Sequence, residues 1–216
     1  MDTHLIQRTP EWLGARAGSL GASSLHEAIA RTKTGWGASR ANLLARLLVE
    51  RLTGTPHEGF VNSAMQHGID TEPEARAAYS FVADVDVIDV GLVRHPTITG
   101  THASPDGLID APRPGLVELK CPQPAAHIAL LSGEAIPSKY VVQVQWQLAC
   151  TGRMWGDFVS YSPAFPESMR IFVQRLERDG RHIAELEAQV REFLAELDAK
   201  LAALTSRYGA PVREAA

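Results

Sequence analysis

Two acidic residues and one lysine gather around a predicted β-hairpin. The chain reads Ser-Pro-Asp-Gly at residues 104–107 and Glu-Leu-Lys-Cys-Pro at residues 118–122, with a turn rich in proline and glycine between them. Two short apolar segments that flank such a turn are typical of a hairpin. The side chains of Glu118 and Lys120 then point to the same face of their strand, and pairing across the turn brings Asp106 close to Glu118.

These residue types could carry out metal-assisted chemistry on a phosphate. Carboxylate oxygens are natural ligands of a hard cation such as Mg²⁺. An ammonium group two residues further along can orient or deprotonate a metal-bound water and offset phosphate charge. An isolated Glu-x-Lys pair also occurs on many solvated strand faces, where it forms only a minor ion pair. The motifs on both sides of the turn favour the first interpretation.

Length and composition predict one domain that spans residues 1–216. The chain is 45% hydrophobic, which is enough to bury one substantial core. Its apolar runs are too short to span a membrane, and its first residues lack the pattern of a signal peptide, so we expect a cytoplasmic protein with no membrane partner. Two cysteines, Cys121 and Cys150, exclude both a disulfide scaffold and a four-cysteine metal site.

The net charge of −4 is an argument against a nucleic-acid-binding protein, because such domains usually carry a basic excess. This net charge does not exclude a nucleic-acid-binding protein. Arginine and lysine side chains can be concentrated on one wall of the molecule, and a bound cation offsets the carboxylates that hold it.

The first third of the chain predicts helices separated by a glycine- and serine-rich loop. Residues 10–16 are expected to form a short helix with proline in its first turn. Ser24 followed by Glu27 fits a capping box, so a second helix is expected to begin there. A helix N-terminus behind such a loop favours an anion, which Arg16 and Ser23 could both face. An ordinary cap and a surface arginine are the alternative.

Two further helices are expected at residues 39–52 and 63–82. Leucines recur at helical spacing in the first of these, and Gly54 follows it. Pro73 lies inside the second, which predicts a kink or a late start near Asp70. Just before the first of these helices, residues 31–37 are interpreted as a mobile basic loop whose tryptophan either contacts nucleic acid or is simply solvated.

The second half of the chain predicts the strands of a sheet and a long helix. Residues 85–92 are expected to form its first strand, and residues 154–161 and 169–176 its last two. Residues 138–149 fit either a half-buried strand or a helix, because their glutamines satisfy both periodicities. Apolar residues at helical spacing predict a long amphipathic helix around residues 180–206.

Five short segments occur in the order found in the lambda-type exonucleases of phage recombination, the YqaJ-like family. They are Trp12 to Arg16 with Ser23 behind it, Gly68 to Glu72, Ser104 to Gly107, Glu118 to Pro122, and Gln143 to Gln145. Together they resemble this family and include its PD-(D/E)-x-K nuclease motif. The resemblance covers roughly residues 8–205, and five ordered segments are far more specific than any one of them.

The resemblance implies an α/β (α+β) fold with a restriction-endonuclease-like core, in which a mixed β-sheet is flanked by helices. It favours a helix for residues 138–149. It also implies a catalytic set of Asp106, Glu118, Lys120, Glu72 and Gln143. In that set the metal ligands would be Asp106, Glu118 and the backbone carbonyl of Leu119, with Glu72 as a second-metal or supporting carboxylate. Arg16, Ser23 and Ser104 would hold a terminal 5′-phosphate.

The function implied by the resemblance is an Mg²⁺-dependent deoxyribonuclease, for which Mn²⁺ is a candidate substitute. It would digest one strand of linear duplex DNA from a 5′-phosphorylated end and leave a 3′ single-stranded tail for an annealing protein. The family also implies a ring-shaped homotrimer. A structure-specific or RecB-type endonuclease is the alternative within the same motif, and a non-catalytic protein that binds DNA ends is a more remote one.

Overall fold

The computed structural model describes residues 5–33, 35–57 and 62–209, and a mixed four-stranded sheet lies at its centre. The strands are, in spatial order, β6 (Gly107–Ile109), β7 (Gly115–Lys120), β8 (Trp155–Tyr161) and β9 (Ile171–Glu177). β6–β7 and β8–β9 are antiparallel pairs, whereas β7 and β8 run parallel. This topology confirms the predicted hairpin, the two closing strands and the mixed sheet.

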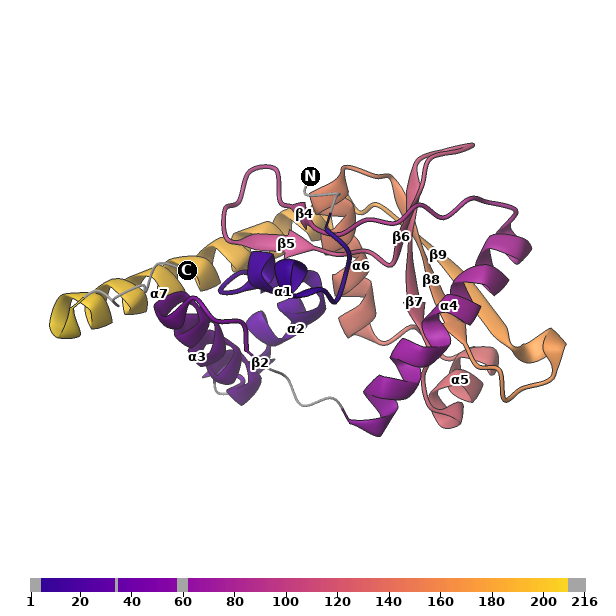
Figure 1. Ribbon diagram of the computed structural model, residues 1–216, viewed down its shortest axis with the longest axis horizontal. Helices are drawn as coiled ribbons and strands as arrows, with labels where there is room; N and C mark the ends of the chain where they lie inside the picture. Colours follow the sequence, from indigo (N-terminus) through magenta and orange to yellow (C-terminus); the bar gives the residue numbers. More distant parts are fainter. Residues whose placement is uncertain (1–4, 34, 58–61, 210–216) are drawn as a thin grey trace.

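Helices cover both faces of this sheet. Along β7, Val117 and Leu119 pack into the same cluster as Tyr79 of α4 (Ser63–Ala83). Leu116 points to the opposite face and packs with Val144 of α6 (Ser138–Thr151). The short helix α5 (Pro124–Leu131) contacts β8 and β9. Figure 1 shows α4 running across the strands on one side of the sheet, with α6 beside them. Alternation along a single strand therefore separates two layers of core.

A smaller three-stranded sheet lies beside α6. Its strands are, in spatial order, β1 (Leu20–Gly21), β5 (Thr101–Ala103) and β4 (Val93–Arg94). The helical elements around it are α1 (Pro10–Arg16), the 3₁₀ turn η1 (Ala22–Ser24), α2 (Leu25–Ala28) and α3 (Ala38–Thr53). A second 3₁₀ turn, η2 (Glu167–Met169), precedes β9.

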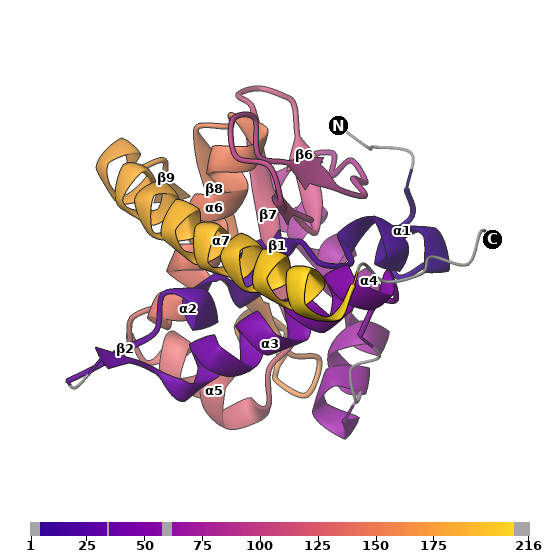
Figure 2. The same cartoon turned by 90° about the vertical axis from the view of Figure 1, so that its left-hand side faces the viewer.

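The long helix α7 (Gly180–Tyr208) packs against α3, α2 and α6. Its buried residues are Ile183, Leu186, Val190, Phe193, Leu194 and Leu197, which recur every three or four positions. Figure 2 shows α7 running past α2 and α3. The helix predicted around residues 180–206 is thus confirmed. No helix in the described part of the chain is both long enough and apolar enough to cross a membrane.

The predicted helices at residues 10–16, 39–52 and 138–149 are also present, as α1, α3 and α6. α3 ends where Gly54 takes a left-handed conformation with φ of 72°. α6 explains why its sequence fits two periodicities: every residue from 142 to 150 is buried. A helix that is surrounded by protein has no solvent face to mark its period.

The capping box predicted at Ser24 is wrong. Ser24 has helical backbone angles, and its side chain makes no capping hydrogen bond. Instead, Arg46 of α3 donates a hydrogen bond of 3.2 Å to its hydroxyl oxygen. The chain enters the four-residue α2 through the 3₁₀ turn η1, so the helical conformation already begins at Ala22. Tertiary contact with α3 has replaced the local cap.

The mobile loop predicted at residues 31–37 is an ordered hairpin over the part that the structure describes. β2 (Arg31–Thr32) pairs in antiparallel fashion with β3 (Gly35–Trp36). The Trp36 ring lies between two guanidinium groups, with Arg31 and Arg40 at 3.8 and 4.0 Å from its centroid. Both arginines stack on the indole, which therefore does not present a free face to a base.

Two further predictions around α4 need correction. The helix runs from Ser63 to Ala83 with Pro73 inside it, so the late start near Asp70 is wrong. Residues 85–92 do not form a strand; Ile88 makes one isolated bridge to Leu108, and strand structure begins only at β4. Val85 and Val87 pack instead against the sheet face that α4 covers, together with Tyr79, whereas Val90 packs in the other core cluster. Apolar alternation in this segment reflects packing without a partner strand.

Candidate active site

The β6–β7 hairpin brings the two predicted carboxylates together. Gly107 is paired with Val117, so Asp106 lies opposite Glu118 at the end of the hairpin. The backbone N–H of Leu119 donates a hydrogen bond of 2.7 Å to Oδ2 of Asp106. Gly107 follows Asp106 because a Cβ there would lie 2.1 Å from Cγ1 of Val87. The spacing of the two motifs therefore produces the predicted contact.

Glu118 is almost fully buried, with 1% of its surface exposed, and is surrounded by hydrogen-bond donors. Lys120 Nζ forms an ion pair with its Oε1, as expected for two residues on one strand face. Gln143 Nε2 donates to the same oxygen at 2.5 Å, and Gln147 Nε2 donates to Oε2. A buried carboxylate is tolerated only when it is paired and hydrogen-bonded, and this one has three donors.

Helix α6 provides both glutamines. Gln143 and Gln147 are one turn apart and face Glu118 together. Gln145 lies on another side of the helix, where its amide donates to the carbonyl of Glu177 and accepts from the N–H of Asp179. The alternating glutamines thus divide between two tasks: two bind the buried carboxylate, and one holds the start of α7.

The charges of the site are strongly coupled. Burial, together with the charge of Glu118, raises the pKa of Asp106 to about 8, against the opposing effect of Lys120. Burial alone would lower the pKa of Lys120, but Glu118 and Asp106 outweigh it and the net shift is upward. Lys120 is therefore an ammonium group at neutral pH and cannot accept a proton in this state.

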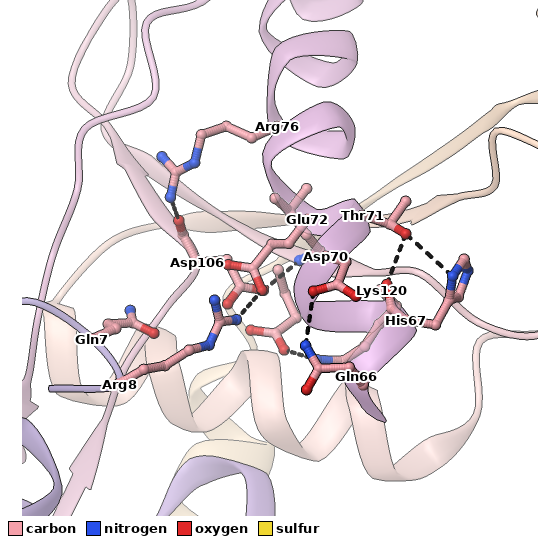
Figure 3. A network of polar contacts seen from close by, with 12 residues as sticks. Gln7, Arg8, Gln66, His67, Asp70, Thr71, Glu72, Arg76, Asp106 and Lys120 are labelled. Atoms are coloured by element: carbon pink, nitrogen blue, oxygen red, sulfur yellow. Dashed lines mark hydrogen bonds and ion pairs between the residues drawn. The ribbon is translucent and has the colours of Figure 1, made fainter. Parts of the chain in front are cut away.

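Helix α4 brings Glu72 to an open pocket that Lys120 and Gln143 also line. This pocket has a volume of about 680 Å³ and is named the carboxylate pocket here. Its lining includes Arg8, Ser23, Met65, Glu72, Leu119, Lys120, Tyr140 and Gln143. Glu72 forms an ion pair with Arg8, which comes from the segment before α1. Figure 3 shows the Arg8 side chain extending toward Glu72, with Asp106 beside the pair.

The donors of the carboxylate pocket fit a hard divalent cation that keeps part of its water shell. Asp106 and Glu118 offer carboxylate oxygens next to the lining residues Leu119 and Lys120, and Leu119 directly follows Glu118 in the chain. Within the described residues, no group of three or more His, Cys, Asp and Glu side chains could hold a metal by itself. Mg²⁺ is typically held by one or two carboxylates, water and substrate phosphate, which is compatible with this set.

Arg16 lies in a second pocket, named here the arginine pocket. Its guanidinium stacks on Trp12 with 3.9 Å to the ring centroid, and its Nε–H donates a hydrogen bond of 3.1 Å to Nε2 of His102. Burial, opposed by Glu50 and assisted by Arg46, lowers the pKa of Arg16 to about 10, so it stays charged at neutral pH. The lining also includes Ser19, Ser23, Arg46 and Met65.

His102 holds Arg16 as a neutral acceptor. Burial and the charges of Arg16 and Arg94 lower its pKa to about 3. Because Nε2 accepts from Arg16, the ring proton lies on Nδ1, which is 2.8 Å from the hydroxyl of Ser19. The guanidinium of Arg16 is therefore fixed from two sides, by a ring stack and by a hydrogen bond.

The three residues predicted to hold a phosphate do not all lie in one pocket. Arg16 and Ser23 line the arginine pocket, and Ser23 also lines the carboxylate pocket, so the two pockets adjoin. Ser104 lines neither of them. Its Oγ is buried and has no hydrogen-bond partner within the described residues, two positions before Asp106.

Several residues of the site were not predicted from the sequence. Gln147 had a signal, because it lies four positions after Gln143 on the same helical face. Arg8 and His102 had none, because their partners Glu72 and Arg16 are distant in sequence. Contacts of this kind follow from the fold and leave no local pattern.

Comparisons with known proteins agree on one family. A model of the YqaJ-like viral recombinase domain matches residues 11–154, a stretch that includes Arg16, Glu72, Asp106, Glu118 and Lys120. Among curated proteins, no sequence matched the chain.

Among solved structures, the chain is similar to an alkaline exonuclease, LHK-Exo, from Laribacter hongkongensis. The identity is 46%, with a TM-score of 0.84, over 92% of this chain and 97% of that one. A second structure of LHK-Exo, in complex with dAMP, matches equally well. A phage-related exonuclease from Haemophilus somnus 129PT has 15% identity and a TM-score of 0.66, over 88% of this chain and 96% of that one, and shows the same fold.

Fold and comparisons together define a nuclease, an enzyme that acts on DNA, of the phage exonuclease type. The chain belongs to the YqaJ-like viral recombinase domain family, of the lambda-exonuclease type. This family membership suggests a requirement for a divalent metal.

Proposed function

We propose that this chain, acting as a single nuclease domain, is an Mg²⁺-dependent 5′-to-3′ exonuclease. It digests one strand of linear duplex DNA from a 5′-phosphorylated end and leaves a 3′ single-stranded tail for an annealing protein. The observation that carries this proposal is the adjacency of the two pockets, which share Ser23 and Met65. A terminal phosphate bound at Arg16 lies next to the carboxylates that serve the scissile phosphate.

The metal is assigned to Asp106, Glu118 and the backbone carbonyl of Leu119, with Mn²⁺ as a substitute for Mg²⁺. When bound, the cation supplies charge stabilisation at the phosphoryl oxygens and a more acidic water. Lys120, which is charged in this structure, orients the attacking water and offsets the charge on the phosphate. Gln143 and Gln147 keep Glu118 in place, so that the carboxylate does not rotate when a ligand enters.

The same set of residues argues against a non-catalytic protein that binds DNA ends. Such a protein has no need of a buried glutamate beside two further carboxylates, whose desolvation destabilises the fold. The similar LHK-Exo has been crystallised with dAMP, which supports a mononucleotide as the product here. Arg16, Ser23 and Ser104 are assigned to the 5′-phosphate.

A digestion assay tests the proposal. Linear duplexes with 5′-phosphate or 5′-hydroxyl ends are compared with closed circular DNA, each in Mg²⁺, Mn²⁺ or EDTA. We expect digestion only of linear DNA and only with metal, with a preference for the phosphorylated end. Arg16→Ala should abolish that preference, because a charge-assisted contact of this kind contributes about 1.5–3 kcal/mol. Cleavage of circular DNA would favour the endonuclease alternative.

A further inference from the structure

Arg8 stands out in the carboxylate pocket because of its backbone. It has φ of 71°, in the left-handed region that residues with a side chain rarely adopt. The other non-glycine residue with positive φ in the described chain is Asp84, where the conformation simply ends α4. At Arg8 no helix ends; the residue lies in a turn closed by a hydrogen bond from the N–H of Thr9 to the carbonyl of Ile6. Strained residues of this kind persist where the surroundings fix them, and they concentrate at functional sites.

The neighbours of Arg8 fix this conformation on both sides. The Gln7 side-chain amide donates to the carbonyls of Val90 and Pro105, both at 2.8 Å. Pro105 immediately precedes Asp106, so this contact ties the N-terminal segment to the backbone next to that residue. On the other side, the Thr9 hydroxyl donates to the carbonyl of Ile6 at 2.9 Å and caps α1.

The fixed backbone aims the Arg8 side chain into the pocket. The guanidinium forms an ion pair with Glu72 of α4, yet 47% of the side chain remains exposed. A guanidinium has five N–H donors, and one carboxylate oxygen engages only part of them. Figure 3 shows the arginine in the space between Glu72, Asp106 and the N-terminal segment. Donors therefore remain for a ligand that enters the pocket.

The charge balance indicates what that ligand is. Arg8, Lys120 and Lys139 bring positive charge to this pocket, whose lining includes Glu72, and Asp106 and Glu118 contact its residues Leu119 and Lys120. A DNA phosphodiester adds another negative charge, so its entry is favoured by positive charge that can contact it directly. Arg8 supplies this charge, and its planar fork matches phosphate oxygens.

We propose that Arg8 is a substrate-binding residue that contacts a phosphodiester of the DNA strand in the carboxylate pocket, and that Glu72 positions it for this contact. The proposal rests on the proposed nuclease function. In this structure the carboxylate of Glu72 is engaged by Arg8 and thereby positions the guanidinium.

The test measures binding of DNA separately from its cleavage. A short 5′-phosphorylated duplex is titrated with enzyme by fluorescence anisotropy, with Ca²⁺ replacing Mg²⁺ and the duplex verified intact on a gel. Each titration is repeated at several KCl concentrations. Arg8→Ala should weaken binding about tenfold and reduce the slope of log K against log salt by roughly 0.7–0.9, which corresponds to one lost phosphate contact.

Three further variants distinguish loss of the phosphate contact from a change in protein stability. Arg8→Gly removes the guanidinium and relieves the left-handed backbone, so it should bind like Arg8→Ala with an unchanged or raised melting temperature. Arg8→Lys should keep the salt slope but lose part of the affinity. Arg181→Ala is the matched control, because Arg181 is 91% exposed and pairs with Glu185 on α7, and it should behave like the wild type.

Two outcomes would overturn the proposal. One is an unchanged salt slope in both Arg8→Ala and Arg8→Gly; the other is an equal loss in Arg181→Ala. The KM for the duplex in Mg²⁺ provides a second measurement, and it should rise in both Arg8 variants by the same factor as the dissociation constant. Failure of the nuclease function is distinguishable, since it appears in the wild type as a lack of preference for linear, phosphorylated DNA.

Discussion

The position of Lys120 at the end of β7 explains its ion pair with Glu118. It lies two residues after Glu118, so its ammonium group returns to the carboxylate on the same face. The carboxylates hold the proton on Lys120 and raise its pKa above the ordinary value, despite the opposing effect of burial. A charged lysine at this point can orient water and face a phosphate, whereas a neutral lysine acting as a base would need a different surrounding.

Lys120→Ala is expected to reduce DNA digestion by at least the roughly 10²–10³-fold that is typical for the loss of one positioned electrostatic donor. The protein should remain folded, because 26% of the Lys120 side chain reaches solvent. Digestion rates and circular dichroism measure the two effects. Lys200→Ala on α7 is a matched control whose activity should not change. Near-normal turnover of a folded Lys120→Ala protein would disprove the assigned role.

Asp106 predicts a dependence of stability on pH in the metal-free protein. Burial and Glu118 raise its folded-state pKa from 3.8 to about 8. A raised pKa means that the folded state binds the proton more tightly. The resulting stabilisation is therefore complete below about pH 4 and is lost as pH rises through about 8. Asp106→Asn keeps a neutral side chain of the same shape at every pH.

The measurement is thermal unfolding in EDTA between pH 4 and pH 9. The melting temperature of Asp106→Asn, relative to that of the wild type, should rise with pH up to about 8 and level off above that pH. Added Mg²⁺ should stabilise the wild type most at the alkaline end, since a cation favours the charged carboxylate. Parallel curves for the two proteins would show that Asp106 is ionised throughout.

At the scale of elements, the hairpin and α6 form the frame of the site. The pairing of Gly107 with Val117 sets Asp106 opposite Glu118, and α6 covers Glu118 from the other side. The start of β7 is also fixed by packing. A Cβ on Gly115 would lie 2.1–2.4 Å from atoms of the Trp155 indole, whose ring also contacts Arg175 at 3.6 Å.

Gly115→Ala should therefore destabilise the protein by about 1–3 kcal/mol, as is usual for overpacking of a closely packed core. Urea unfolding measures the change. Gly14→Ala is the control, because a Cβ there meets no atom within 4 Å and alanine favours the α1 helix. A loss of stability confined to Gly115→Ala would tie the frame of the site to this contact; equal stability of both variants would contradict it.

The elements that sequence could predict are those whose signal is local. The hairpin has its turn, α3 has leucines at helical spacing and Gly54, and α7 has a long apolar repeat, so all three are found where expected. Asp106, Glu118 and Lys120 could be grouped for the same reason, since one hairpin contains them.

The predictions that failed depend on contacts between distant segments. Ser24 lost its capping role to Arg46, and Val85 and Val87 pack beside Tyr79 without forming the predicted strand. The helix α5 was not predicted from the sequence. It is anchored by buried His127, whose ring contacts Ser160 and the carbonyl of Met169. Arg8 and His102 belong to the same class, because only tertiary structure brings them to their partners.

For the whole molecule, the net charge of −4 raises the question of how the enzyme stays on DNA. Electrostatic adhesion is weak for an acidic protein and weaker still at physiological salt. A processive exonuclease needs another way to stay bound to DNA, and a closed ring around the duplex provides one. Head-to-tail contacts between identical subunits close into rings when the rotation permits it. We therefore predict a ring-shaped homotrimer with its arginines and lysines toward the channel.

Light scattering coupled to size exclusion should give a mass of about three times the 23.5 kDa of one chain at micromolar concentration. A salt challenge tests the nature of the hold. If the ring encircles DNA, raising KCl before the reaction should block loading, whereas raising it after loading should leave digestion of the bound molecule largely intact. An electrostatic hold predicts equal inhibition in both orders of addition. A monomeric mass that persists with DNA and Mg²⁺ bound would exclude the ring, and processivity would then have to come from contacts such as those of Arg8 and Arg16.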